Sequence, residues 1–353
     1  MQWSPSDQET VTQDIRVFSG SAHRELAQEI CDYMQVPLLP SITSRFSNDN
    51  LYVHLGMSVR EKRVFIVQPL SPPASDHLLE LLMMVDAARH ASARRIHAVI
   101  PYFSYARSDK KDEPRISITA RLIADLLTTA GASHVITMTL HSPQVHGFFP
   151  IPVDHLTAES VFIRHFRQRD LSNTVVVSPD IGHAKRAAKL ARALNVPLAA
   201  ANKQRLSDDH VVIDALIGDV RGKDVIISDD EIATAGSVVE LIEHLKCENV
   251  GRITVAGTHG VFSGPAIDRL RAIPEISEIV TTNTVPVPEK KRLPNMTILS
   301  VGSIFADAMR CNTLGRSVGK LFAFWMDESE AGQNAKHSEP SHTDAGGPPE
   351  ANA

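Results

Sequence analysis

Short apolar runs alternate with helical patterns along most of this chain, and no other feature restricts the fold as much. The runs are rich in β-branched residues, as buried strands are, and the segments between them repeat apolar residues at helical spacing. We expect helices over 78–88, around Leu126 and around Leu190, and strands at 15–18, 64–67, 96–100, 135–138, 175–177, 196–200, 225–227, 253–256 and 279–281. Strands that alternate with helices form parallel sheets covered on both faces. The sequence therefore predicts an α/β fold.

The length of the chain indicates two domains of this kind. A chain of 353 residues exceeds what one hydrophobic core usually contains. Two prolines in FFPIPVDH suggest a boundary near 150–156, so we expect domains at 13–156 and 157–296, although no sequence repeat proves a duplication. The first dozen residues are polar, and we expect them to be loosely ordered. Residues 327–353 are acidic and poor in apolar side chains, which predicts a disordered tail.

Composition excludes several classes of protein. The net charge is −5, and most of this excess lies in the acidic tail, so the folded body has no basic field for nucleic acid. No apolar run approaches the ~18 residues that span a bilayer, and the polar N-terminus does not resemble a secretory signal. Cys31, Cys247 and Cys311 are far apart and unpaired in sequence. This spacing favours a reducing cytoplasm over a disulfide framework or a thiolate zinc site.

The stretch VIISDDEIATAGSVVELIEHL, residues 225–245, carries the clearest chemical signal. It reads as a strand that leads into a helix, with Asp229 and Asp230 after the strand and the small residues 234–237 before the helix. Backbone N–H groups at a helix N-terminus suit a phosphate, whereas the two carboxylates suit hydroxyl groups or a metal. Together they describe a site for a sugar phosphate. An acidic strand-to-helix turn capped by Thr or Ser remains the alternative.

These residues resemble a known family. SDDEIATAGS is similar to the phosphoribosyl-binding loop of the phosphoribosyltransferase fold, and the whole chain resembles the ribose-phosphate pyrophosphokinase family. The resemblance extends over about 15–322, through RFSNDN (45–50), ELLMMVDAAR (80–89), VIPYFSYARSDKKD (99–112), TLHSPQVHGFF (139–149), VVSPDIGHAKR (176–186), THGVFSGPAI (258–267) and SVGKLF (317–322). It implies two similar doubly wound domains, with about 297–322 returning to the first. It also implies that the pyrophosphoryl group of Mg-ATP passes to the 1-hydroxyl of ribose 5-phosphate, giving phosphoribosyl pyrophosphate and AMP for nucleotide biosynthesis.

The resemblance assigns the sugar phosphate to the second domain. Asp229 and Asp230 are expected to hold the ribose hydroxyls, and the 5-phosphate is expected to lie on Ala233, Thr234, Ala235, Gly236 and Ser237. The family most often has an acid where Ala233 stands, although some relatives have a small uncharged residue there. Lys203 and Arg205 match a mobile catalytic loop that closes over the transferred group, and Arg205 also contacts ribose 5-phosphate. Without the resemblance, we would interpret residues 201–212 as a polar loop at the surface.

The resemblance assigns ATP to the first domain. In RFSNDN, Phe46, Asn48 and Asn50 are expected to hold adenine, although the family has an acid at the position of Asn50 and the stretch alone reads as a polar turn. In the charged segment 105–112, Arg107, Ser108 and Asp112 are expected near the ATP phosphates. Ser108 stands where the family commonly has Gln, and a solvated charged loop is the alternative.

The resemblance implies a Mg²⁺ site held by His141 and Asp180, with His141 also contacting ATP. A structural histidine and a helix N-cap aspartate are the alternatives. Two departures from the family lie close by. Thr139 stands where the family has an acid, and a hydroxyl is a weak substitute for a carboxylate on Mg²⁺. His183 stands where the family usually has Gly, so its side chain is expected to crowd the pyrophosphate loop.

Family members form hexamers with ATP sites at subunit contacts, so a homo-oligomer that binds ATP and ribose 5-phosphate is expected. Two other functions stay open. A catalytically silent paralogue that regulates an active enzyme would explain Thr139, Ala233 and His183, although it would not need Lys203 and Arg205. A phosphoribosyltransferase that consumes the product would not explain the ATP segments.

Overall fold

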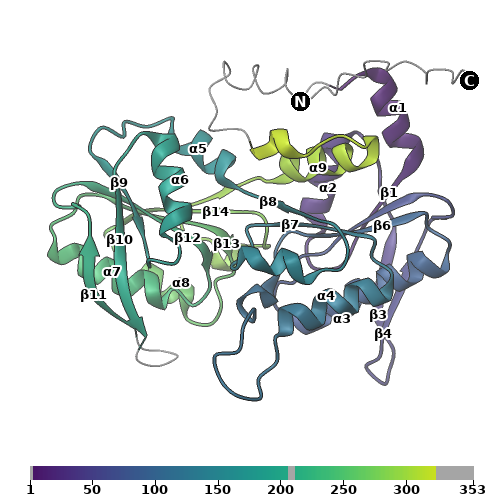
Figure 1. The fold of residues 1–353 in the computed structure, drawn as a ribbon, viewed down its shortest axis with the longest axis horizontal. Helices are drawn as coiled ribbons and strands as arrows, with labels where there is room; N and C mark the ends of the chain where they lie inside the picture. The colour runs from purple at the N-terminus through teal and green to yellow at the C-terminus, as the bar shows by residue number, and fades with distance from the viewer. Residues whose placement is uncertain (1–2, 206–210, 323–353) are drawn as a thin grey trace, which may run out of the picture.

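The computed structural model describes residues 3–205 and 211–322, and in this part of the chain two parallel sheets lie side by side (Figure 1). The first sheet has the order β2-β1-β5-β6-β7-β8, and every neighbouring pair in it is parallel. Its strands are β1 (Ile15–Ser19), β2 (Leu38–Leu39), β5 (Arg63–Val67), β6 (Arg95–Ile100), β7 (His134–Met138) and β8 (Val153–Leu156). The expected α/β fold is confirmed.

The second sheet has the order β11-β10-β9-β12-β13-β14-β15, with one antiparallel pair, β10 with β11, at its edge. Its strands are β9 (Thr174–Ser178), β10 (Leu198–Arg205), β11 (Val211–Ile217), β12 (Asp224–Ile232), β13 (Ile253–Gly260), β14 (Ile276–Thr282) and β15 (Met296–Leu299). The prediction of a loop over 201–212 is wrong in its first half. β10 continues to Arg205 because its backbone pairs with β11, as Lys203 does with Ile213.

Helices cover both faces of each sheet, as buried parallel strands require. On the first sheet, α2 (Arg24–Met34) and α9 (Gly302–Leu314) cover one face, and α3 (Ala74–His90) and α4 (Thr119–Ala130) cover the other. On the second sheet, α5 (Glu159–Phe166) and α6 (Ala184–Leu194) lie opposite α7 (Gly236–Cys247) and α8 (Ala266–Arg271). The helices α2, α9, α5 and α6 share one hydrophobic cluster, so a continuous core joins the two halves.

Both ends of the described chain differ from expectation. The polar N-terminus forms a helix, α1 (Pro5–Asp14), because Ser4 and Asp7 make a capping box and Val11 is buried. The segment 297–322 was expected to return to the first domain. Its helix α9 does so, whereas its strand β15 does not. β15 pairs with the open edge of β14 in the second sheet, whereas α9 packs on α2. The predicted disordered tail, 327–353, lies outside the described residues.

Smaller elements complete the fold. The antiparallel hairpin of β3 (Ser41–Arg45) and β4 (Leu51–Leu55) projects from the first domain on the side away from the second sheet (Figure 1). Short 3₁₀ turns lie at η1 (Ser104–Arg107), η2 (Pro143–Phe148), η3 (Glu289–Lys291) and η4 (Gly319–Phe322). Among the described helices, none has the length and apolar character needed to cross a membrane.

Candidate active site

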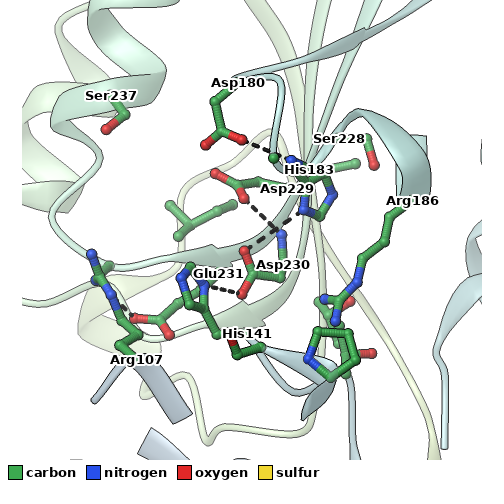
Figure 2. A pocket seen from close by; sticks show the side chains of 18 of the residues that line it. Arg107, His141, Asp180, His183, Arg186, Ser228, Asp229, Asp230, Glu231 and Ser237 are labelled. Carbon is green, nitrogen blue, oxygen red and sulfur yellow. Dashed lines mark hydrogen bonds and ion pairs between the residues drawn. The ribbon is translucent and has the colours of Figure 1, made fainter. Parts of the chain in front are cut away.

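A cavity of about 1020 Å³ opens between the two sheets, where the carboxyl ends of their strands meet. Ligands of parallel α/β sheets usually bind in this position. Its walls come from the segments after β6 and β7 in the first domain, and from those after β9 and β12 in the second (Figure 2). The fold therefore brings segments that are far apart in sequence to one place.

The segment after β12 has the geometry of an anion-binding turn. β12 stays extended through the two acids and ends at Ile232, and α7 begins at Gly236. Ala235 lies in the left-handed region, with a φ of 60°, and this conformation turns the chain into the helix. Arg269 donates a hydrogen bond to the carbonyl oxygen of Thr234 at 3.0 Å, which holds the turn in place. Asp229, Asp230 and the expected phosphate-binding residues 233–237 all line the cavity.

Asp230 links the two domains through His141. Its Oδ2 lies 2.8 Å from His141 Nδ1, and its backbone N–H donates to Asp229 Oδ1 at 2.8 Å. The hydrogen bond to Asp230 raises the pKa of His141. Burial opposes ionisation of Asp230, but the hydrogen bond and charge of His141 outweigh it and lower the pKa of this carboxyl. Burial, together with the neighbouring charge of Asp230, raises the pKa of Asp229.

Asp180 and His183 approach the same acids from the loop between β9 and α6. Asp180 Oδ1 accepts a hydrogen bond from the backbone N–H of His183 at 2.7 Å. Asp180 therefore caps the turn before the helix, which begins only at Ala184. The side chain of His183 is 10% exposed, and its Nδ1 lies 3.9 Å from Asp230 Oδ1. Burial lowers the pKa of His183. Sequence analysis identified His183 only as a residue that crowds the loop.

The backbone that presents His141 is fixed by side chains from elsewhere. The carbonyl oxygen of Thr139 accepts a hydrogen bond from His259 Nε2 at 3.1 Å. The N–H of Leu140 donates to His155 Nε2 at 2.9 Å, and its carbonyl oxygen accepts from Arg186. Sequence analysis missed these three side chains. His259 and Arg186 stand within motifs that resemble the family, but a buried histidine or arginine gives no local sign of what it contacts.

Glu231 forms a second link between the domains. Tyr102 donates its hydroxyl hydrogen to Glu231 Oε2 at 3.1 Å, and Arg107 Nη1 lies 3.9 Å from Glu231 Oε1. Burial raises the pKa of Glu231, and the nearby charge of Arg107 opposes this change. Arg107 and Asp112 line the cavity, as expected, whereas Ser108 is not among the lining residues.

One group of expected residues lies away from the cavity, and the side chains of a second group are outside the described part of the structure. Phe46, Asn48 and Asn50 lie at the tip of the β3–β4 hairpin, and none of them lines the cavity. Phe46 is 59% exposed and packs edge-on against Tyr52, with ring centroids 5.5 Å apart. Lys203 and Arg205 lie in the backbone of β10, and their side chains are outside the described part of the structure.

The donor groups in the cavity fit a divalent cation. Ligand atoms of His183, Asp229 and Asp230 lie within 4.8 Å of one another. His141 and Asp180, the two expected metal ligands, line the same cavity. Carboxylate oxygens are the ligands that hard cations such as Mg²⁺ prefer, and imidazole suits transition metals.

The fold and the site define a class of protein. An anion-binding turn that follows two acids at the carboxyl edge of a parallel sheet, facing a second α/β domain, is the arrangement of a two-domain enzyme that acts on a sugar phosphate. Two family models match the chain: the N-terminal domain of ribose phosphate pyrophosphokinase over residues 15–131, and the phosphoribosyl synthetase-associated domain over 212–323. The chain belongs to the ribose-phosphate pyrophosphokinase family, and it is an enzyme of phosphoribosyl pyrophosphate synthesis.

Individual relatives align over nearly their whole length. A Streptomyces coelicolor protein of this family is 55% identical over 309 residues, which is 88% of this chain and 98% of the relative. A Deinococcus radiodurans ribose-phosphate pyrophosphokinase is 53% identical over 313 residues, which is 87% of this chain and 98% of that one. The crystal structure of a Mycobacterium smegmatis phosphoribosylpyrophosphate synthetase is similar with a TM-score of 0.81 at 37% identity, covering 86% of this chain and 99% of that one.

Proposed function

We propose that the cavity between the sheets binds ATP and ribose 5-phosphate and transfers the pyrophosphoryl group to the sugar 1-hydroxyl, forming phosphoribosyl pyrophosphate and AMP. One observation carries this assignment. The acids and anion-binding turn of the second domain face Arg107 and His141 of the first across a single cavity. A sugar-phosphate site and a polyphosphate site therefore share one space. Neither a silent paralogue nor a phosphoribosyltransferase gains support from the relatives, which align with both domains.

The second domain binds the sugar phosphate in this proposal. Asp229 and Asp230 accept hydrogen bonds from the ribose hydroxyls, and the backbone N–H groups of residues 233–237 bind the 5-phosphate at the start of α7. The contact of Arg269 with Thr234 supports this role, because it holds the turn in shape and places a positive charge beside it in the cavity wall. The 1-hydroxyl of the sugar then points toward the first domain.

The first domain binds the polyphosphate chain. Arg107, His141 and Asp112 lie on that side of the cavity, and Lys203 and Arg205 would close over the transferred group from the edge of the second sheet. Pyrophosphoryl transfer depends mainly on alignment of the attacking hydroxyl and on stabilisation of the charge that develops on phosphate oxygens. Positive side chains on both sides supply that stabilisation, and none of them needs to form a covalent bond.

Mg²⁺ is the cation that we assign to the phosphate side, held by His141 and Asp180. When bound, it neutralises charge on the phosphates. Thr139 is a poor candidate for a ligand, because a neutral hydroxyl is a weak substitute for a carboxylate on Mg²⁺. Mg²⁺ keeps several waters and needs few protein ligands where phosphates are present, so the loss of an acid at this position is compatible with activity.

Adenine binding and the cellular setting complete the proposal. Phe46, Asn48 and Asn50 are remote from the cavity of their own chain, so they would serve the cavity of another copy in a homo-oligomer. Ser108 does not line the cavity, which weakens its assignment to ATP.

The free thiols of Cys31, Cys247 and Cys311 support a reducing compartment, the cytoplasm.

The nucleotide product tests the reaction. Purified protein incubated with ATP, ribose 5-phosphate and Mg²⁺ should release AMP in equal amount to phosphoribosyl pyrophosphate, because the β-phosphorus is attacked. Chromatography identifies the nucleotide, and ³¹P NMR identifies the diphosphate ester. Omission of ribose 5-phosphate is the control and should abolish AMP formation. Formation of ADP, or no turnover at any Mg²⁺ concentration, would exclude this reaction.

A further inference from the structure

His183 is a largely enclosed side chain whose ring makes no hydrogen bond to the described residues. Nine-tenths of its side chain is enclosed. Its backbone N–H donates to Asp180, but neither ring nitrogen takes part in a hydrogen bond within the described part of the chain. The nearest charged atom is Asp230 Oδ1 at 3.9 Å, which is too far for a hydrogen bond. The ring nitrogens are open to the cavity that His183 lines, so a ligand in the cavity can bind them.

The ring of His183 faces two carboxylates. Figure 2 shows it beside Asp229 and Asp230 at the wall of the cavity. One ligand atom from each of the three residues lies within 4.8 Å of the others. Bonds of about 2.1 Å to a central ion place neighbouring ligand atoms roughly 3 Å apart, so small side-chain rotations are enough to close this set around an ion. Asp230 keeps its other oxygen on His141.

We propose that His183, Asp229 and Asp230 form a divalent-cation site whose imidazole ligand selects a first-row transition ion such as Mn²⁺ over Mg²⁺. Mg²⁺ binds oxygen ligands and dehydrates reluctantly, whereas transition ions accept imidazole readily. A cation here also compensates the charge of two adjacent carboxylates, which repel each other. The proposal rests on the proposed function only in placing this ion beside the ribose hydroxyls. His183 is thus the residue that determines metal specificity.

Direct binding of Mn²⁺ to the protein without substrates tests the site. Electron paramagnetic resonance measures the free ion, and spin-echo modulation from ¹⁴N reports a coordinated imidazole. His183→Ala should weaken Mn²⁺ binding about tenfold or more and reduce the ¹⁴N modulation, while Mg²⁺ binding changes less. Any modulation from His141 is present in both proteins and cancels in the comparison. His90→Ala, which removes an exposed imidazole on α3, should leave both signals unchanged.

Thermal unfolding distinguishes loss of the metal site from a folding defect in the variant. His183 has no hydrogen bond to lose, so metal-free His183→Ala should unfold at or above the temperature of the parent protein. Mn²⁺ should raise the unfolding temperature of the parent more than that of the variant, because binding to the native state stabilises it. Equal Mn²⁺ affinity and equal ¹⁴N modulation in the two proteins would overturn the proposal. An inactive parent enzyme would instead contradict the proposed reaction, since the binding measurements need no turnover.

Discussion

Thr139 has a backbone conformation that β-branched residues rarely adopt. Its φ is 44°, in the left-handed region, and such a position is strained unless the surroundings impose it. Here the surroundings are hydrogen bonds that His259 and Arg186 donate to the carbonyl oxygens of Thr139 and Leu140, and one that the N–H of Leu140 donates to His155. Two of these side chains belong to the second domain. The direction in which His141 points is therefore fixed by residues across the cavity, which makes His259 a positioning residue.

The tautomer of His259 follows from its partners. A carbonyl oxygen only accepts, so Nε2 carries the hydrogen that binds Thr139, and Nδ1 accepts from the Thr284 hydroxyl at 2.9 Å. Burial lowers the pKa of His259 to about 4, which keeps the ring neutral in this arrangement at neutral pH. The amide nitrogen of a glutamine reaches the place of Nε2, whereas that of an asparagine reaches only the place of Nδ1.

His259→Asn should therefore lower kcat about tenfold or more, because His141 loses its alignment, with little change in KM for ribose 5-phosphate. His259→Gln keeps the donor to Thr139 and should retain most of the activity. Steady-state kinetics of both variants, alongside their unfolding temperatures, separates alignment from stability. Equal kcat in the two variants would show that the hydrogen bond to Thr139 has no part in catalysis.

Helix α1 and Trp3 pack against α9 of the first domain. Trp3, just before the helix, lies under the guanidinium groups of Arg310 and Arg316, at 5.4 and 5.5 Å from its ring centroid. Arg316 pairs with Asp7 at 2.7 Å, and Arg310 donates to Gln8 Oε1 at 2.9 Å. Arg310 is only 8% exposed, so it depends on these partners. The N-terminal segment thus packs on α9 and on the residues that follow it.

Deletion of residues 1–14 should destabilise the protein by about 2–4 kcal/mol, because it uncovers apolar surface around Val11 and removes the contacts of Arg310 with Gln8 and Trp3. Urea unfolding measures the change as a lower midpoint. Ser4→Ala is the matched control. It removes only the side-chain cap of α1, which costs about 1 kcal/mol. An unchanged midpoint after the deletion would mean that α1 packs without stabilising the fold.

The arrangement of the whole chain separates the hairpin from the cavity. β2 and β8 are opposite edges of the first sheet. The β3–β4 hairpin follows β2, whereas the second domain follows β8, so the two lie on different sides of the first domain (Figure 1). No rearrangement of side chains can bring Phe46 to the cavity of its own chain. A complete site with adenine on Phe46 therefore requires a second copy.

Mixed oligomers test this requirement. Phe46→Ala and Asp229→Asn should each lower activity strongly when present alone. Co-expressed with different tags, the two should recover roughly a quarter of the parent activity, since random assembly pairs an intact hairpin with an intact cavity in that share of sites. A mixture of Asp229→Asn with Asp230→Asn is the control, because both changes lie in the cavity, and it should recover nothing. Failure of the first mixture to recover, in oligomers shown to contain both chains, would assign adenine to another place.

Local sequence determined the interior strands of the two sheets and the phosphate turn, but not the strands β2, β3, β4, β8, β11 and β15. The nine expected strands correspond to β1, β5, β6, β7, β9, β10, β12, β13 and β14, because a buried parallel strand needs a continuous apolar run that is visible in any short window. The turn after Asp229 and Asp230 was visible for the same reason, since its acids, small residues and helix are neighbours in sequence. The antiparallel end of β10 and the helix α1 were missed, because both are polar segments without an apolar repeat; pairing with β11 extends β10, and a capping box starts α1.

Only the tertiary structure decided how the site is assembled. The contact of His259 with Thr139 joins residues 120 positions apart, and that of His141 with Asp230 joins residues 89 apart. A hydrogen bond depends on distances of a few ångströms and on the direction of a donor, and no periodicity or composition encodes these. The same holds for His183, which the sequence identified as a departure from the family. Its enclosure beside two carboxylates, and thus its capacity to bind a metal, arises from the packing of the β9–α6 loop against the end of β12.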